Sequence, residues 1–450
     1  MSLGSAIIRK VLHPLYTRRS HPAAAQYKAL FEKTQYYDRS ALEKLQLELL
    51  NRLLHHARQS CPFYRERLEA AGLGATLSSL SELRSLPALT KRDIQVHGPQ
   101  MMAQGFPESE RIRNQTGGST GSPLQFLVDR ERLDARLAAT ERHNEWAGLR
   151  PGDWCAYLWG ARLDQISTAT LRDRLRNELL YRRVELNTSQ ITAEGLSRFT
   201  DAVRRKRPRF LIAYAYSAHL FAEHVIKEGI GDITFDAMIT TAEVLMPETR
   251  RLLEKTFGGR VFNRYGCREV SIIASECDQH NGMHVHSESL LVEIEPDPSL
   301  PDGLGRILVT DLRNLSMPLI RYEIGDVAAW SKTAACPCGR GLPLLDDVRG
   351  RTTDFLIMPD GSRISGPSLT LVVADMSEVS QVQFVQNSEQ SITLRVVPGV
   401  GYGEATRAEL RKRLDLYLRG RAALDIQEAP PIASEASGKY RFVVNASEIK

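Results

Sequence analysis

The alternation of helical segments with short apolar segments between residues 130 and 266 constrains the fold more than any other feature of the sequence. Each of four helical segments is followed by a short, strand-like run. In chain order the pairs are 131–149 and 154–160, 191–207 and 209–214, 217–229 and 235–243, and 247–258 and 260–266. Helices that alternate with single strands are typical of crossover connections, so the pattern predicts an α/β fold with a largely parallel sheet.

The regions on either side of this alternation have different patterns. Residues 1–110 are predicted to be mostly helical, and Ser40 with Glu43 has the spacing of a capping box ahead of a leucine stripe. After residue 266, the strand-like segments 290–297 and 305–312 are separated by a turn rich in Pro and Gly. Such a turn favours antiparallel pairing.

The polar stretch 346–355 predicts a domain boundary close to Arg351. A chain of 450 residues also exceeds what one core usually serves. We therefore expect a large N-terminal domain over residues 1–350, with 1–110 as its helical lead-in, and a small mobile α+β domain over 351–450.

Composition and charge exclude several classes of protein. The chain is 42% hydrophobic and 25% charged, an ordinary globular balance, and its net charge of +5 gives only a mild preference for anionic ligands. The basic run 204–207 is interpreted as a solvated helix end rather than a nucleic-acid site. No run of 18 apolar residues predicts a membrane span, and Arg9 with Lys10 interrupts the apolar N-terminus. These features predict a cytoplasmic protein.

Three glycines lie among hydroxyl side chains in residues 113–126, RNQTGGSTGSPLQF. Glycine costs backbone entropy on ordering, and bare amides beside hydroxyls can solvate a phosphate. A flexible surface loop is the alternative. The stretch lacks the lysine of a Walker loop, so a cation or distant residues must balance the charge of a bound phosphate. The candidate residues are Thr116, Gly117, Gly118, Ser119, Thr120 and Gly121.

Further polar residues stand at predicted strand ends, where open parallel sheets bind ligands. Glu243 ends one strand, Tyr265 ends another with Glu269 just beyond it, and Asp326 follows a glycine at a turn. A carboxylate there can hold a metal ion or ribose hydroxyls, and an aromatic ring can stack on a base. Each has a structural alternative: Glu269 can cap a helix, Asp326 can close a turn, and Lys439 can be an ordinary solvated lysine.

Taken together and in this order, the motifs resemble the adenylate-forming superfamily of acyl-CoA synthetases, most closely its branch of phenylacetate–coenzyme A ligases and CapK-like proteins. CPFYRERLEAAGL and LRSLPALTKRDI resemble the N-terminal signature of that branch, TGGSTGSP its phosphate loop and NRYGCRE its adenine and metal motif. MPLIRYEIGD resembles the ribose motif, CPCGRGLP and GRTTD the hinge region, and SGKYRF the C-terminal lysine motif.

The resemblance implies a two-step reaction. A carboxylic acid attacks the α-phosphate of ATP to give an acyl adenylate, the C-terminal domain rotates, and coenzyme A takes the acyl group. Glu269 would hold Mg²⁺, Asp326 the ribose, and Lys439 would bridge the acid and the α-phosphate. The implied nucleotide site comprises the loop 116–121 with Ala242, Glu243, Asn263, Tyr265, Gly266, Asp326 and Arg351.

Two alternatives stay open at this stage. The acceptor can be a carrier-protein thiol or an amine, as in natural-product or polysaccharide assembly, or the chain can be a catalytically silent nucleotide-binding relative. The acyl substrate is not readable: Trp159, Tyr214 and Tyr216 would suit an aromatic-accepting pocket but also suit a core. The oligomeric state is equally open, with a homodimer compatible with the sequence.

Several positions depart from the pattern of the family. Arg268 stands where the family usually has Thr or Ser, and it either grips a phosphate or carboxylate or points outward. Thr353 stands where an aspartate commonly marks the hinge, with Asp354 next to it, and Ser122 stands where phenylacetate-type ligases often carry lysine. These departures bear on the hinge and on the second half-reaction.

The cysteines give a second signal. Cys277, His284, Cys336 and Cys338 supply three thiolates and one imidazole, a set that suits tetrahedral Zn²⁺. His280 and His286 are rival fourth ligands. The alternative is a set of unrelated buried thiols. Of the remaining cysteines, Cys61 and Cys155 are predicted to be core residues, and Cys267 to line the nucleotide site without binding metal.

Overall fold

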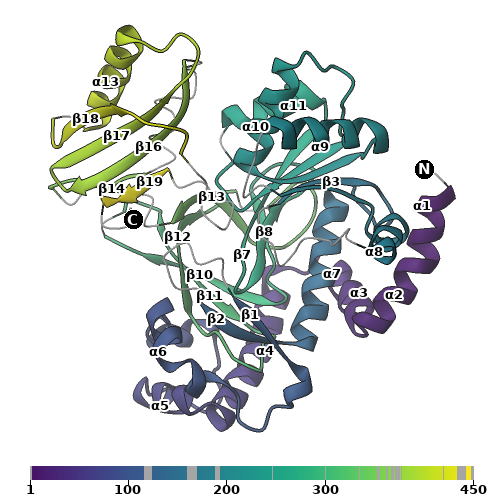
Figure 1. Ribbon diagram of the computed structural model, residues 1–450. Helices are drawn as coiled ribbons and strands as arrows, with labels where there is room; N and C mark the ends of the chain where they lie inside the picture. Colours follow the sequence, from purple (N-terminus) through teal and green to yellow (C-terminus); the bar gives the residue numbers. More distant parts are fainter. Residues whose placement is uncertain are drawn as a thin grey trace.

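The computed structural model describes most of the chain. It leaves out residues 1–2, 116–123, 160–169, 188–192, 246, 299, 334, 352–354, 361–362, 366–368, 370–375, 377, 419, 433–441 and 447–450. Figure 1 shows a sheet-centred body with helices below and to one side of it, and a smaller C-terminal body. In the described part, no helix combines the length and hydropathy that crossing a membrane requires.

The N-terminal region is helical, as predicted. Its helices are α1 (Leu3–Ile7), η1 (Ile8–Leu12), α2 (His13–Ser20), α3 (Ala24–Thr34), α4 (Arg39–Ser60), α5 (Pro62–Ala70), η2 (Leu80–Ser85), α6 (Lys91–Met101) and η3 (Glu108–Glu110). The predicted capping box of Ser40 and Glu43 is wrong. Helix α4 begins two residues earlier than such a box implies, at Arg39, because its N-cap is Asp38: the backbone of Asp38 is extended and its carboxylate accepts the Ala41 amide at 2.8 Å.

A single eleven-stranded sheet forms the centre of the molecule, in the order β10-β11-β12-β13-β9-β8-β7-β6-β5-β3-β4. Strands β3 to β7 pair in parallel, and the remaining pairs are antiparallel. The strands are β3 (Cys155–Trp159), β4 (Arg183–Asn187), β5 (Phe210–Tyr214), β6 (Ala237–Thr241), β7 (Arg260–Cys267), β8 (Ser271–Glu276), β9 (Met283–Val285), β10 (Leu290–Pro296), β11 (Gly305–Asp311), β12 (Tyr322–Trp330) and β13 (Leu344–Arg351). Both the parallel half and the later antiparallel half confirm the predicted fold class.

Helices cover the sheet because its parallel strands are joined by crossovers. They are α7 (Arg130–Trp146), α8 (Leu171–Arg176), η5 (Asn177–Tyr181), α9 (Ala193–Lys206), α10 (Ala215–Lys227) and α11 (Pro247–Phe257). Phe199, Phe221 and Phe257 come from three of these helices and are buried together in the core of the parallel half. A second core lies beneath the N-terminal helices and includes Leu50 and Tyr64.

The hairpin of β1 (Arg111–Gln115) and β2 (Gln125–Asp129) pairs in antiparallel register, with Gln115 opposite Gln125. Its connection contains the glycine-rich loop, of which residues 116–123 lie outside the described residues. Gln115 and Leu124 are the described residues that flank it, and α7 follows the other end of β2 directly.

The C-terminal residues form a four-stranded sheet of order β18-β17-β16-β19. Its elements are β16 (Val379–Ser388), β17 (Ser391–Pro398), α13 (Glu404–Leu418), β18 (Ala423–Glu428) and β19 (Val443–Asn445), and a short hairpin, β14 (Phe355–Ile357) with β15 (Arg363–Ser365), precedes it. Phe384, Leu394 and Leu414 belong to a separate apolar core here. The division at residues 350 and 351 stays a prediction, and it falls at the end of β13.

Candidate active site

The candidate nucleotide residues begin at the carboxyl ends of β6 and β7. These strands are parallel neighbours with Thr240 opposite Asn263, so Ala242 and Glu243 leave the sheet beside Asn263 and Tyr265. Ala242 has a positive φ of 69°, which is unusual for a residue with a Cβ and turns the chain sharply as β6 ends. The fold thus places four of the predicted residues at one edge of the sheet.

Tyr265 and Asp326 make a direct contact although they lie 61 positions apart in the sequence. The Tyr265 hydroxyl donates a hydrogen bond of 2.6 Å to Asp326 Oδ2. Burial and the nearby Asp326 carboxylate raise the pKa of Tyr265 well above its ordinary value, so the hydroxyl stays a donor. Asp326 follows Gly325, which has a φ of +91°, and lies opposite Arg351 of β13.

The tight β7–β8 connection carries Glu269. Gly266 is required where it stands, because a Cβ on it would lie 2.3 Å from the Ser271 carbonyl oxygen. The Glu269 carboxylate accepts a hydrogen bond of 3.1 Å from the buried hydroxyl of Tyr322, at the start of β12. Burial and the neighbouring Glu269 raise the pKa of Cys267 well above its usual range, so that thiol is neutral beside the site.

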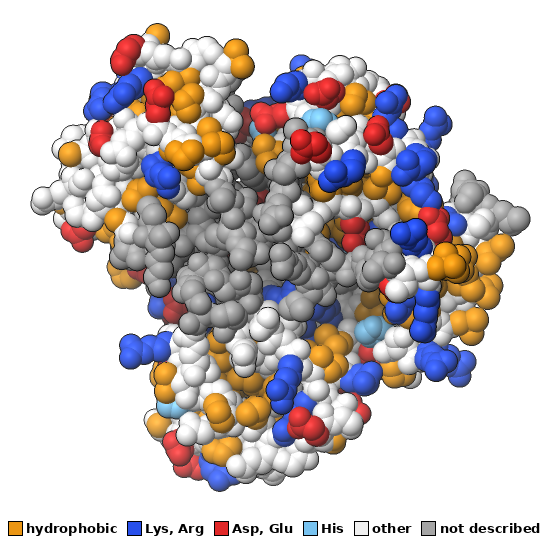
Figure 2. Space-filling view, viewed as in Figure 1, with side chains coloured by type: hydrophobic (Ala, Val, Ile, Leu, Met, Phe, Trp, Pro, Cys, Tyr) orange, Lys and Arg blue, Asp and Glu red, His pale blue; other side chains and the backbone are white. Residues whose placement is uncertain are grey.

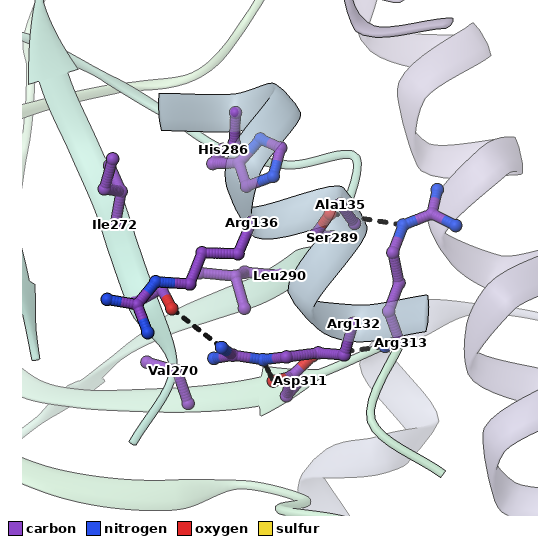
Figure 3. A pocket seen from close by; sticks show the side chains of 12 residues that line it. Arg132, Ala135, Arg136, Val270, Ile272, His286, Ser289, Leu290, Asp311 and Arg313 are labelled. Atoms are coloured by element: carbon purple, nitrogen blue, oxygen red, sulfur yellow. Dashed lines mark hydrogen bonds and ion pairs between the residues drawn. The ribbon is translucent and has the colours of Figure 1, made fainter. Parts of the chain in front are cut away.

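The turn around Glu269 is held from behind by Arg132 of α7. This side chain is 4% exposed and pairs with Asp311 Oδ2 at 2.9 Å. It also donates to Ser271 Oγ at 2.8 Å and to the Glu269 carbonyl at 3.1 Å. Figure 3 shows Arg132 extending from α7 across a small pocket towards Asp311 of β11 and towards Val270 in the β7–β8 turn. Sequence reasoning missed Arg132, which belongs to no recognised motif. It also missed Tyr322, which lies within the ribose motif MPLIRYEIGD but was not singled out there.

Arg268 points to the base of the glycine-rich loop. Its Nε donates a hydrogen bond of 3.1 Å to Asn114 Oδ1, on the strand that leads into residues 116–121. Of the other predicted residues, Thr116 to Gly121, Thr353, Asp354 and Lys439 lie outside the described residues, as does Ser122. For Arg351, the backbone pairing with Asp326 is described but the side chain is not.

The predicted cysteine and histidine ligands form one cluster. The ligand atoms of Cys277, His284, Cys336 and Cys338 all lie within 4.8 Å of one another. The Sγ atoms of Cys277 and Cys336 are 3.7 Å apart, and Cys338 Sγ lies 3.3 Å from His284 Nε2. His284 Nδ1 faces the Leu342 carbonyl oxygen at 3.4 Å, which leaves Nε2 as the ligating nitrogen.

The surroundings of the cluster distinguish the rival ligands. His280 Nδ1 faces Glu276 at 3.2 Å, and His286 Nδ1 faces Glu288 at 3.1 Å, so both are engaged elsewhere. Burial raises the pKa of Cys277 to about 12 and lowers the pKa of His284 to about 4. Without a cation, therefore, the Cys277 thiol and the His284 imidazole are neutral, whereas hydrogen bonds from Arg340 lower the pKa of Cys338 against the effect of burial.

The remaining predicted side chains are partly placed. Cys61 and Cys155 are buried, as predicted for core residues. The rings of Trp159 and Tyr214 contact each other with centroids 4.9 Å apart at the ends of β3 and β5, and Tyr214 is 4% exposed. The side chain of Tyr216 is outside the described part of the structure.

Comparison with known proteins agrees with this fold. Residues 356–446 match the family model described as the CapK C-terminal domain. A phenylacetate–coenzyme A ligase of Thermus thermophilus is 28% identical over 331 residues, covering 71% of this chain and 72% of the relative. The protein CapK of Staphylococcus aureus is 22% identical over 417 residues, covering 90% and 89% respectively.

Solved structures give the same answer for the fold. The 2-hydroxyisobutyryl-CoA ligase in the postadenylation state, in complex with an acyl-AMP, matches with a TM-score of 0.75 and 22% identity, covering 92% of this chain and 91% of that one. The same ligase in the thioesterification state matches with a TM-score of 0.60 and 24% identity, covering 90% of each chain. The fold is that of the adenylate-forming CoA ligases. Within that class the chain is similar to phenylacetate–coenzyme A ligases and to CapK, as its motifs predicted.

Proposed function

We propose that this protein activates a carboxylic acid with ATP as an acyl adenylate and then transfers the acyl group to coenzyme A. The observation that carries the proposal is the convergence of Tyr265, Asp326 and Glu269 at one edge of the sheet, next to the hairpin that bears the glycine-rich loop. The names of the relatives, phenylacetate–coenzyme A ligases among them, support the same reaction class.

Each residue then has a defined task. Asp326, held by the Tyr265 hydroxyl, binds the ribose hydroxyls, and Ala242, Glu243 and Asn263 line the adenine side. Arg268 stands at the base of the loop 116–121, where the phosphates bind, and its guanidinium can reach an anion there. Arg351 lies across from Asp326 on the last strand before the C-terminal body.

The site suits a magnesium ion. Burial, together with the Glu269 and Asp326 carboxylates, raises the pKa of Tyr265 and of Cys267, so two carboxylates lie close to both groups. Carboxylate oxygens are the ligands that Mg²⁺ prefers, and Glu269 would hold the ion. When bound, Mg²⁺ neutralises phosphate charge that no loop lysine covers.

The second step requires the C-terminal residues 351–450 to turn as a mobile domain about Thr353 and Asp354. Two features support this arrangement. The C-terminal sheet has its own core, and the chain matches the postadenylation structure of a ligase better than the thioesterification structure of the same ligase. In the adenylating orientation Lys439 reaches the α-phosphate; in the other it lies in solvent.

Lys439→Ala tests this two-step mechanism. Loss of a preorganised cation at a developing charge typically slows a reaction by roughly a hundredfold or more. We expect that loss in acyl-adenylate formation, measured as pyrophosphate release over a panel of aryl, fatty and amino acids. Supplied with synthetic acyl adenylate, the variant transfers the acyl group to coenzyme A at nearly the parental rate.

Lys412→Ala is the matched control, because this lysine is 80% exposed on α13 of the same C-terminal body. It leaves both half-reactions unchanged. Equal losses in both half-reactions for Lys439→Ala contradict the domain-rotation mechanism.

Adenylate formation without transfer to free coenzyme A favours the second candidate function. In that case the enzyme delivers its acyl group to a carrier-protein thiol or an amine, and the similarity to CapK along the chain supports this alternative.

We also propose a structural zinc ion on Cys277, His284, Cys336 and Cys338, separate from the magnesium site. Three sulfurs and one imidazole nitrogen within 4.8 Å of one another fit tetrahedral Zn²⁺, and a cation there would turn protonated thiols into thiolates. Purification without chelator yields about one zinc per chain. Cys338→Ser lowers that content, whereas Cys61→Ser, at a buried cysteine outside the cluster, retains it. Folded, active protein without zinc refutes the proposal.

A further inference from the structure

Two neighbouring helical segments carry half of the large apolar side chains that are exposed in the described part of the chain. Of twelve such side chains, six lie in residues 3–20 and 170–183. They recur at every fourth position, and their exposed fractions are 47% for Ile7, 48% for Val11, 64% for Leu15, 74% for Leu171, 51% for Leu175 and 51% for Leu179. We call these six side chains the aliphatic face. Apolar side chains gathered in this way mark an interaction surface.

The local backbone keeps each row of the aliphatic face aligned. A spacing of four residues exceeds one turn of an α-helix, which has about 3.6 residues, so such a row drifts around the helix axis. A π-helical turn contains more residues than an α-helical turn, so side chains four positions apart drift around its axis in the opposite direction. Each segment contains one π-helical stretch, η1 at Ile8–Leu12 and η5 at Asn177–Tyr181, which offsets the drift.

The opposite side of the two segments is fixed to the body of the protein. The hydroxyls of Tyr16 and Tyr181 lie 3.1 Å apart and join the segments. Arg182 donates to Ser5 Oγ at 2.9 Å and to the Gly152 carbonyl at 3.1 Å. A Cβ on Gly152 would lie 2.7 Å from the Ser5 carbonyl oxygen, so α1 is packed closely on this loop. The aliphatic face therefore belongs to a docked surface and not to a loose terminus.

The two segments that carry the aliphatic face are rich in Lys and Arg. Residues 3–20 contain four Lys and Arg and no Asp or Glu, and residues 170–183 contain five Arg against two acidic residues. The two segments thus carry a formal charge of +7, more than the +5 of the whole chain, so the rest of the chain is net acidic. Figure 2 shows orange and blue side chains intermingled at the right-hand edge, where α1, α2 and α8 lie in Figure 1.

We propose that the aliphatic face docks the protein on a membrane surface with anionic headgroups. Aliphatic side chains on one side of interfacial helices enter the headgroup boundary, while exposed cations such as Lys10, Arg18 and Arg172 pair with anionic lipids. Their long stems keep the charges at headgroup level. A second copy of the chain is not expected to bind this face, because the two segments of each copy carry a formal charge of +7 and the copies would repel each other. The inference is independent of the proposed reaction.

Vesicle sedimentation of the full chain tests the inference. At low salt, the protein sediments with vesicles of phosphatidylcholine mixed with phosphatidylglycerol but not with phosphatidylcholine alone, and added salt weakens binding. The triple variant Leu171→Gln, Leu175→Gln, Leu179→Gln loses sedimentation. The triple variant Arg18→Gln, Arg19→Gln, Arg172→Gln binds on the order of a hundredfold more weakly, because each cation near such a surface contributes about fivefold.

The matched control changes apolar side chains that are exposed elsewhere. The variant Val96→Gln, Ile226→Gln, Val400→Gln removes three of them and binds vesicles like the parent. All variants retain the parental circular dichroism and pyrophosphate release, which excludes misfolding. The inference is overturned if the protein does not bind anionic vesicles, or if the leucine variant binds them as well as the parent does. It is also overturned if the aliphatic face serves another partner: the protein then forms a concentration-dependent dimer or a complex with an acidic carrier protein, the leucine variant abolishes that association, and vesicles are not bound.

Discussion

Replacing Glu288 by glutamine measures how strongly the body of the protein depends on one buried ion pair. Glu288 is fully buried and pairs with Arg142, which is 1% exposed. Its carboxylate also accepts hydrogen bonds of 3.1 Å from Thr34 Oγ1 and from His286 Nδ1, and Arg142 donates to the Phe31 carbonyl at 3.0 Å. One carboxylate therefore joins α3, α7 and the segment before β10.

The expected loss of stability follows from the burial of both partners of the ion pair. Burial alone would raise the pKa of Glu288, but Arg142 and His286 overcome it and hold the pKa well below its usual range. Glu288→Gln keeps the shape of the side chain but leaves a guanidinium without a carboxylate in a medium of low dielectric constant. Removing one partner of a buried pair typically costs about 3–5 kcal/mol of the free energy of unfolding.

Urea unfolding followed by tryptophan fluorescence is the assay. Trp146 is a local reporter, because the Arg142 guanidinium lies 5.3 Å from the centre of its ring. Glu43→Gln is the control: its partner Arg39 is 89% exposed and Glu43 is 51% exposed, so the midpoint stays where it is in the parent. The double variant Arg142→Met, Glu288→Leu recovers most of the lost free energy of unfolding, because neither buried charge remains. Equal midpoints for Glu288→Gln and Glu43→Gln refute the reasoning.

Two further predictions concern acid and steric strain. Burial lowers the pKa of His143 well below its ordinary value, so this histidine stays neutral in the folded protein while the unfolded chain takes up a proton below about pH 6.5. The free energy of unfolding should therefore fall as the pH drops below that value, by at most about 1.4 kcal/mol per pH unit for this group. Urea unfolding measured at several acidic pH values checks this, and a free energy of unfolding that does not change with pH there argues against it. Gly341→Ala would place a Cβ 1.9 Å from the Tyr37 carbonyl oxygen and should cost about 1–3 kcal/mol, whereas Gly231→Ala, where nothing lies within 4 Å, should not lower the urea midpoint.

The parallel half of the sheet was predictable because each buried strand is an apolar run that follows a helix. The predicted segments 154–160, 209–214 and 235–243 contain β3, β5 and β6, and the segment 260–266 covers all of β7 except its last residue. Strand β4 escaped prediction because it is an edge strand: its sequence, RVELN, alternates polar and apolar residues and has no apolar run. An edge strand buries fewer side chains, so its sequence carries a weaker signal.

The candidate site was predictable as a set of residue types but not as a geometry. Motif order identified Tyr265 and Asp326 separately, whereas their 2.6 Å contact exists only because β12 lies in the same sheet as β7. Arg132 supports Glu269 through a backbone carbonyl, an interaction that no side-chain pattern encodes. The cysteines and the rival histidines of the proposed zinc site were predictable from the sequence, while the choice of His284 over His280 and His286 needed the paired strands β9 and β13.

The pairing of Asp326 with Arg351 has a thermodynamic consequence. Asp326 is proposed to hold the ribose, and Arg351, directly across the β12–β13 ladder, is the last residue of β13, at the predicted domain boundary. Suppose that a ligand binds more tightly in one orientation of the C-terminal body because this rung is tighter there. The ligand then stabilises that orientation by the same free energy by which the orientation strengthens binding of the ligand. Nucleotide occupancy and domain orientation would then be reciprocal partners in one linkage, with a single β-ladder rung as the coupling element.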